Sequence, residues 1–438
     1  MPLSSSAPAP TNAISATFNA PATDTAAAMR VLTLSTTSFT LLFAVWLMFA
    51  VIGIPIQKEL GLSDVQFFWL GSIAILSGSI WRLAFGILTD RIGGKAMFTG
   101  LLLFTAIPTY WVSQATSFTE LMVLAALVGL AGNSFNVGIS WNSAWFPKSR
   151  QGIALGTFGA GNVGASVTKL IGPALIALVP AAGIAGGRIP GGWRFVPVLY
   201  TVLLIAMAAA AWFLSPTIDR KPGKSRPLRE MLRPLRETRV WRFSVYYVVV
   251  FGAYVALALA LPKYYMSVYH LDLGIAAMLA ALFIFPASLL RPLGGWMSDK
   301  YGARVVMYSV FALMSGAAGL LALPTGMLQL GVRGFTALVF LLGIGMGVGK
   351  AAVFKYIPEY FPKDVASVGG LVGLLGALGG FFLPLIFGYM KQLTGWTQTP
   401  FVVLFALVAV SFLWLHVVVL GIKHKNAHAE LRSEIVSA

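Results

Sequence analysis

The sequence predicts an all-α integral membrane protein with twelve transmembrane helices in two parallel six-helix halves. Three observations predict this fold: an apolar composition, twelve apolar runs, and a repeat that relates one half to the other. Of the 438 residues, 58% are hydrophobic and 10% are charged, whereas about a quarter of the residues in a soluble domain are charged. The apolar runs reach the roughly 20 residues that a helix needs to cross the hydrocarbon core.

The twelve apolar runs lie between charged or turn-forming breaks. Those of the N-terminal half, 35–214, are 35–57, 67–88, 96–114, 119–143, 152–178 and 194–214. Those of the C-terminal half, 241–422, are 241–265, 275–297, 303–323, 333–357, 367–391 and 399–422. Residues 1–34 lack the basic start of a signal peptide, so we expect a disordered cytoplasmic tail there. A second cytoplasmic tail is expected at 423–438.

Basic residues predict the orientation of the chain in the membrane. They gather in alternate loops, the ones that would face the cytoplasm if both termini lie inside. The segment 215–240 is the most basic of these loops and is predicted to be a cytoplasmic linker between the halves, solvated or in contact with anionic lipid. These loops also explain the net charge of +17 without a nucleic-acid partner. With no cysteine and four scattered histidines, we expect neither a metal site nor a cofactor.

An internal repeat relates two arginine-containing segments at identical offsets. The matching residues are Arg82, Gly86, Asp90, Arg91, Gly93 and Lys95 in the first half, and Arg291, Gly295, Asp299, Lys300, Gly302 and Arg304 in the second. A second correspondence places Gly132 and Gly347 each 15 residues before a proline, Pro147 and Pro362. Two parallel halves are typical of transporters that move around a central site.

The loop shared by the two repeats resembles the cytoplasmic motif of the major facilitator superfamily. A short glycine-containing turn brings two helix ends together there, so a carboxylate can face a helix N-terminus or a neighbouring base. We therefore predict gate residues in these loops, Asp90 with Arg91 and Asp299 with Lys300. The alternative is a simple interhelical turn with solvated charges.

Arg82 and Arg291 occupy equivalent positions in the second and eighth spans. A charge at the bilayer centre costs about 2.5–3.5 kcal/mol on an insertion scale, and the sequence has no acidic residue in the apolar interior to offset it. Guanidinium offers paired donors that fit a flat oxyanion. The pair therefore predicts a receptacle for a small anion. Snorkelling to the interface or purely structural bonding to carbonyls is the alternative.

Other polar residues lie in or beside the spans. Lys169, Lys350 and Lys355 add positive charge, with Lys355 nearest the cytoplasmic end and the most suited to snorkelling. Two glycine tracts, 152–166 and 369–382, allow backbones to pack closely or a small ligand to approach the main chain. Asn162 lies in the first tract and offers both a donor and an acceptor in the apolar interior.

The tract 132–166 and its counterpart, 343–362 followed by 369–382, resemble the signatures of the nitrate/nitrite porter family. With the two arginine segments, the resemblance covers about residues 35 to 420. It implies that Arg82 and Arg291 bind the anion and that Phe135 and Phe251 sandwich it. It further implies that Asn162 and Tyr247 are polar neighbours of the anion.

The resemblance implies a monomeric transporter of nitrate or nitrite in a bacterial inner membrane. Lys169 and Lys350 resemble the subgroup that imports nitrate with protons, and Lys355 is a third candidate for coupling. The alternatives are a nitrate/nitrite antiporter of the same family and a membrane nitrate sensor that does not transport. We do not expect an enzyme, because no nucleophile, acid or metal set lies inside the predicted spans.

Overall fold

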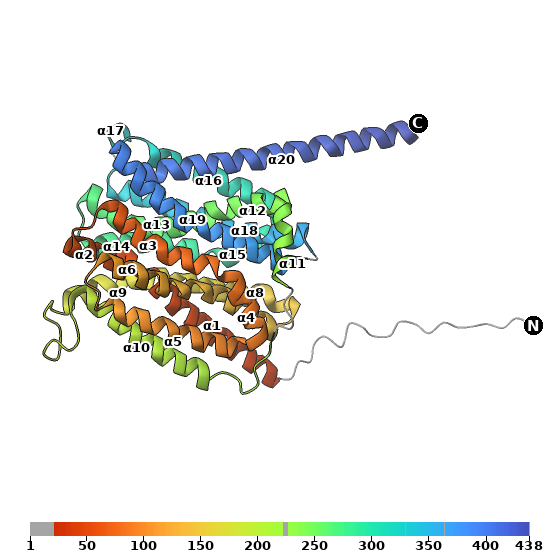
Figure 1. Cartoon of the computed structure of the whole chain (residues 1–438). Helices are drawn as coiled ribbons and strands as arrows, with labels where there is room; N and C mark the ends of the chain where they lie inside the picture. The colour runs from red at the N-terminus through yellow and green to blue at the C-terminus, as the bar shows by residue number, and fades with distance from the viewer. Residues whose placement is uncertain (1–21, 222–226, 329, 363, 438) are drawn as a thin grey trace, which may run out of the picture.

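The computed structural model describes residues 22–221, 227–328, 330–362 and 364–437, and they form a helical bundle (Figure 1). Its first half contains α1 (Ala22–Trp46), α2 (Phe49–Leu60), α3 (Asp64–Ile80), α4 (Arg82–Ile92), α5 (Gly94–Val112), α6 (Phe118–Val128), η2 (Gly129–Asn133), α7 (Ser134–Trp145), α8 (Lys148–Gly159), η3 (Ala160–Val163), α9 (Gly164–Leu178), η4 (Gly192–Arg194) and α10 (Phe195–Phe213).

The second half follows a segment that contains α11 (Leu228–Leu232) and η5 (Arg233–Arg236). It contains α12 (Thr238–Tyr247), η6 (Val248–Gly252), α13 (Ala253–Tyr269), α14 (Leu273–Leu289), α15 (Arg291–Tyr301), α16 (Ala303–Ala322), α17 (Thr325–Leu328), α18 (Val332–Tyr360), α19 (Val365–Thr394) and α20 (Thr399–Ser437). The fold class predicted from the sequence is confirmed, since the described elements are helical apart from one isolated bridge between Ile184 and Ile189.

Length and composition identify most of the predicted spans directly. Among the described residues, nine helical segments are long and apolar enough to cross a membrane, or eleven if the bent pairs α3–α4 and α14–α15 each count as one span. The remaining predicted span corresponds to α5, whose 19 residues include Lys95 and three threonines and extend about 28 Å at 1.5 Å per residue. α5 is less apolar than the other predicted spans, but it is long enough to cross the hydrocarbon core.

Two of the predicted boundaries need correction. The tail predicted for residues 1–34 is wrong from residue 22 onward, because α1 begins at Ala22, and residues 1–21 lie outside the described part. The helix α20 continues through the tail predicted for 423–438, as far as Ser437, and Figure 1 shows it projecting beyond the bundle. Within the predicted linker 215–240, residues 222–226 also lie outside the described part.

The outer surface of the bundle is apolar, as a lipid-facing surface must be. On α10, Val202, Leu203 and Ile205 are 58%, 39% and 50% exposed. A water-soluble protein rarely exposes a contiguous apolar surface of this kind. The exposed face of α10 therefore supports the assignment of this helix as a membrane span.

The two halves meet along α3 with α19 and along α9 with α14. Toward the other end of these spans, α4 and α8 pack far less against the opposite half, on α19 and α15. The halves are therefore closely packed at one end of the bundle, which contains Asp64, and more loosely packed at the other, which contains Asp90. We call these the Asp64 end and the Asp90 end.

A tight turn fixes the position of Asp64. Gly61 ends α2 with a φ of 62°, in the left-handed region that favours glycine. Ser63 then caps α3, since its side chain accepts from the amide of Gln66 while the Gln66 side chain accepts from the amide of Ser63. Asp64 is consequently the first residue of α3, next to the second half.

Candidate functional site

Both predicted arginines lie where a span bends. The axis turns by 46° between α3 and α4, and Arg82 is the first residue of α4. It turns by 40° between α14 and α15, and Arg291 is the first residue of α15. A helix N-terminus carries partial positive charge, so each break adds a helix dipole to a guanidinium in the middle of the bundle. Discontinuous helices of this kind form the substrate sites of many transporters.

Arg82 is buried, with 1% of its surface exposed. Its Nε donates to the carbonyl of Gly78 over 3.0 Å, one turn back across the bend. Its Nη1 donates to the carbonyl of Gly373 in the second half over 3.1 Å. The backbone carbonyl of Arg82 accepts from Asn136 on α7 over 3.0 Å. These bonds hold the guanidinium inside the bundle, so the snorkelling alternative does not apply to Arg82.

The ring of Phe135 lies close to both arginines. Its centroid is 6.0 Å from Cζ of Arg82 and 5.3 Å from Cζ of Arg291. Phe135 is the second residue of α7, directly after the 3₁₀ turn η2. Cations within about 6 Å of an aromatic face are attracted by it. The ring therefore brings together the two charges that the repeat places in separate halves.

Phe251 and Tyr247 face the same region from the second half. The centroid of Phe251 lies 5.5 Å from Cζ of Arg82, and its ring stacks on that of Tyr247 with the centroids 5.1 Å apart. Phe251 lies in the π-helical segment η6, and such segments are frequent at functional sites. A Cβ at Gly376 would lie 2.3 Å from Cδ1 of Tyr247, so a glycine is needed there for Tyr247 to take this position.

Two buried polar groups at the site have no hydrogen-bond partner among the described residues. They are Nη1 of Arg291 and the side-chain amide of Asn162, both its Oδ1 and its Nδ2. Asn162 lies in the 3₁₀ turn η3 of the first glycine tract and is 1% exposed. A buried unsatisfied polar group costs about 1–3 kcal/mol, and the accepting oxygens of a bound oxyanion would offset this cost for the two donors, Nη1 of Arg291 and Nδ2 of Asn162.

The three lysines separate into a buried pair and a surface residue. Nζ of Lys350 donates to the carbonyl of Ala287 over 2.9 Å and lies 3.3 Å from the centroid of Tyr254. Nζ of Lys169 donates to the carbonyl of Ala165, in its own helix, over 3.2 Å. Lys355 instead pairs with Asp299 at 2.5 Å, with 37% of its side chain exposed, so the structure places it outside the buried group.

The predicted gate carboxylates contact groups of their own halves. Asp90 is hydrogen-bonded to Ser140 of α7, and Asp299 forms the ion pair with Lys355 of α18. Of their basic neighbours, Arg91 is exposed, and Nζ of Lys300 lies 5.1 Å from the ring of Trp296. Within the described residues, the contacts of these four side chains therefore do not join the two halves in this conformation, which fits the looser packing of the Asp90 end.

Some residues of the site were not predicted. Phe354 lies under Arg291, with its centroid 5.5 Å from Cζ, and makes an edge contact with Tyr247. The ring of Trp46 lies 5.9 Å from Cζ of Arg82. The internal repeat relates one further pair of residues. Phe135 lies 12 residues before Pro147, and Lys350 lies 12 residues before Pro362, the matching proline of the second half. Lys350 is thus the counterpart of Phe135 in the second half.

The arrangement has the chemistry of an anion site. Neither Arg82 nor Arg291 forms an ion pair with a carboxylate within the described part of the chain. Two guanidiniums, two helix N-termini and an unpaired amide would all favour negative charge, and flat aromatic rings exclude water around them. This fold and this arrangement are those expected of a membrane carrier that binds an anion between its two halves.

Comparison with known proteins agrees with this class. The family model described as Major Facilitator Superfamily matches residues 34–284 and 243–437. A bacterial homolog of the human lysosomal transporter Spinster, in an inward-facing and occupied conformation, superposes with a TM-score of 0.71 at 17% identity, covering 88% of this chain and 96% of that chain. The chain therefore belongs to the major facilitator superfamily.

Comparison with individual relatives assigns the chain to one family within the superfamily. The chain is 61% identical to the "Probable nitrate/nitrite antiporter NarK1" of Thermus thermophilus, over 91% of this chain and 93% of that protein. It is 31% identical to the "Probable nitrate transporter NarT" of Staphylococcus carnosus, over 87% of this chain and 95% of that protein. Within the superfamily it is a member of the nitrate/nitrite porter family.

Proposed function

We propose that this protein transports nitrate and nitrite across the membrane by alternating access. The observation that carries the proposal is the position of the Phe135 ring, 6.0 Å from Cζ of Arg82 and 5.3 Å from Cζ of Arg291, with no carboxylate paired to either arginine in the described residues. Relatives named as nitrate and nitrite transporters support the choice of anion.

The shape and charge of the site favour a small planar monoanion. A guanidinium presents two parallel N–H donors in one plane, which match two oxygens of a flat oxyanion. The Phe135 and Phe251 rings add flat walls close to Arg82. Sulfate and phosphate are tetrahedral, larger and doubly charged, so their desolvation would cost more. We therefore expect nitrate and nitrite to compete with one another and sulfate not to compete.

The packing of the halves supports movement around this site. The Asp64 end is closed by α3 against α19 and by α9 against α14, whereas the Asp90 end is looser. From the distribution of basic loops, we infer that the Asp90 end and both termini are cytoplasmic. The described conformation is then closed on the outer side and more loosely packed toward the cytoplasm of a bacterial inner membrane, and we infer that reversal of this packing would open the site outward.

Two modes of coupling remain, each supported by its own observation. Import with protons is supported by Lys169 and Lys350, which are buried without an acidic partner in the described residues. A lysine of this kind could carry a proton with the anion, because the bound anion favours the charged ammonium. Exchange of nitrate for nitrite is supported by the relative named as an antiporter. We propose proton-coupled import, with exchange as the second candidate.

Reconstitution into liposomes tests the function and the coupling together. We expect nitrate uptake that is inhibited by nitrite and unaffected by equal sulfate. Acceleration by an inward pH gradient would support symport, and acceleration only by internal nitrite would support exchange. Binding of nitrate without uptake under either condition would contradict transport and favour a sensor. Dilution of the protein to one copy per vesicle also tests the expectation that a monomer is sufficient.

A further inference from the structure

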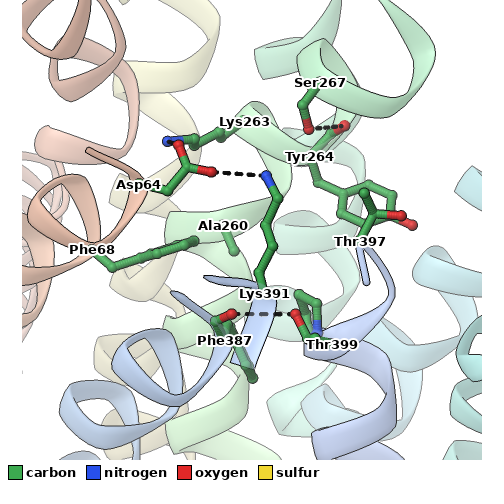
Figure 2. A pocket seen from close by; sticks show the side chains of 11 residues that line it. Asp64, Phe68, Ala260, Lys263, Tyr264, Ser267, Phe387, Lys391, Thr397 and Thr399 are labelled. Carbon is green, nitrogen blue, oxygen red and sulfur yellow. Dashed lines mark hydrogen bonds and ion pairs between the residues drawn. The ribbon is translucent and has the colours of Figure 1, made fainter. Parts of the chain in front are cut away.

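An ion cluster joins the two halves at the Asp64 end. The carboxylate of Asp64, at the start of α3, lies 2.6 Å from Nζ of Lys263 on α13 and 2.8 Å from Nζ of Lys391 on α19. Asp64 belongs to the first half and both lysines belong to the second. Figure 2 shows the carboxylate between the two ammonium groups in a pocket that Tyr264, Ser267 and Thr399 also line.

Further contacts tie this cluster to both halves. Gln57 of α2 donates to Oδ1 of Asp64 over 3.1 Å and accepts from Nζ of Lys263 over 2.7 Å. Nζ of Lys263 also lies 4.4 Å from the ring centroid of Phe67. The contacts of Lys263 with Gln57 and Phe67 cross from one half to the other, so they must break when the Asp64 end opens, whereas the bond between Gln57 and Asp64 lies within the first half.

The cluster contains two ammonium groups and a single carboxylate. When the halves separate, Asp64 leaves with α3 and Gln57 leaves with α2. Lys263 and Lys391 then remain together on the second half without an acidic partner in the cluster. Because a lysine is a compact point charge, it accepts any small anion and does not require one geometry.

From this geometry we propose that Lys263 and Lys391 form an entry site for a small external monoanion, which Asp64 occupies with its own carboxylate while the Asp64 end is closed. The inference rests on the proposed anion transport. A carboxylate, nitrite and nitrate each present two oxygens on a central atom and carry one negative charge. An incoming anion can therefore replace Asp64 on the lysines, so that no ammonium is left unpaired.

This entry site is distinct from the central site. Asp64 and Arg82 are 18 positions apart on the span formed by α3 and α4, which corresponds to about 27 Å at 1.5 Å per residue. An anion at the entry site would favour the open Asp64 end, because it binds a lysine pair that is available only when Asp64 has left. The external anion would thus promote its own access to the central arginines.

The test uses a single reporter cysteine, since the natural chain has none. Ser267 lines the pocket, and its hydroxyl bonds only to the Tyr264 carbonyl of its own helix, at 3.3 Å, in the described structure. The full-length Ser267→Cys protein in right-side-out vesicles would be labelled with a membrane-impermeant maleimide. We expect slow labelling that added nitrate accelerates, compared with gluconate at equal ionic strength.

Asp64→Asn keeps the size of the side chain and removes its charge. We expect it to raise the labelling rate without nitrate by roughly two- to thirtyfold, the range for loss of two partly exposed ion pairs, and to abolish the nitrate response. Lys391→Gln should raise the rate less, because one ion pair remains. Glu59→Gln is the matched control, since Glu59 pairs at 2.7 Å with Arg194 of the same half, and it should behave as the parent.

Two results would overturn the proposal. An unchanged labelling rate in both Asp64→Asn and Lys391→Gln would show that the cluster does not hold the end closed. Loss of the nitrate response in Arg82→Lys, which keeps the cluster but impairs the central site, would show that nitrate acts only at the centre. Nitrate counterflow by the Ser267→Cys parent is measured in parallel, so that failure of transport itself is distinguished from failure of the entry site.

Discussion

The guanidinium of Arg82 donates a hydrogen bond to the backbone carbonyl of Gly373 over 3.1 Å. Arg82 belongs to the first half of the protein and Gly373 to the second. The bond therefore joins the halves at the central site, where the carbonyl takes one of the donors that an anion would use. Hydrogen bonds between two charged groups are stronger than those to a neutral carbonyl, so a bound oxyanion can replace Gly373 as the acceptor.

The first prediction concerns the geometry of the guanidinium. Arg82→Lys and Arg291→Lys keep the charge but lose the planar pair of donors. Since a hydrogen bond to a charged group contributes about 1.5–3 kcal/mol, each variant should weaken nitrate binding by roughly 10- to 150-fold. Binding is measured by thermal stabilisation of the purified protein across nitrate concentrations. Arg304→Lys, at the start of α16, is the control, and near-parent affinity in either central variant would contradict the prediction.

The second prediction compares two glycines one turn apart on α19. A Cβ at Gly376 would lie 2.3 Å from Cδ1 of Tyr247, whereas a Cβ at Gly373 would meet nothing within 4 Å. We therefore expect Gly376→Ala to displace Tyr247 and lower the affinity for nitrate, while Gly373→Ala retains it. Both substitutions keep the backbone carbonyls. Equal affinities in the two variants would show that the position of Tyr247 does not matter for binding.

The third prediction concerns the buried lysines. Lys169→Gln and Lys350→Gln remove a titratable group from the interior, so we expect loss of nitrate accumulation driven by a pH gradient but retention of nitrate counterflow. Lys355→Gln serves for comparison, because Lys355 pairs with Asp299 at 2.5 Å and is partly exposed. Proteoliposome uptake with and without the gradient measures the difference. Accumulation with an unchanged pH dependence in both interior variants would rule out coupling through these lysines.

The fourth prediction concerns the gate at the Asp90 end. A Cβ at Gly156 on α8 would lie 4.0 Å from Cγ of Pro292 in the other half, so Gly156→Cys reports on the separation of the halves there. Adding Asp90→Asn should change the rate at which this cysteine is labelled without abolishing nitrate binding. Ser140→Ala removes the hydrogen-bond partner of Asp90 within its own half, so it separates the effect of losing that bond from the effect of losing the Asp90 charge. Identical labelling rates with and without Asp90→Asn would contradict a gate.

The residues themselves predict part of the site. Arg82, Arg291 and Asn162 could be identified because an unpaired polar group is costly in hydrocarbon and therefore needs a reason. Phe135, Phe251 and Tyr247 could not, since an aromatic side chain in a span is unremarkable by composition, and they came from the family resemblance alone. Phe354 was missed for the same reason. The structure brings all of these aromatic residues close to the two arginines.

Local sequence determined that this chain enters a membrane, how many spans it forms and where its halves repeat. The free energy of transferring a side chain into lipid depends on that side chain and its near neighbours, so membrane spans can be predicted from local sequence. Which charges meet depends on contacts between distant segments. Lys391 and Asp64, 327 positions apart, became partners only through packing, and the same packing assigned Lys355 to Asp299 and Phe135 to both arginines.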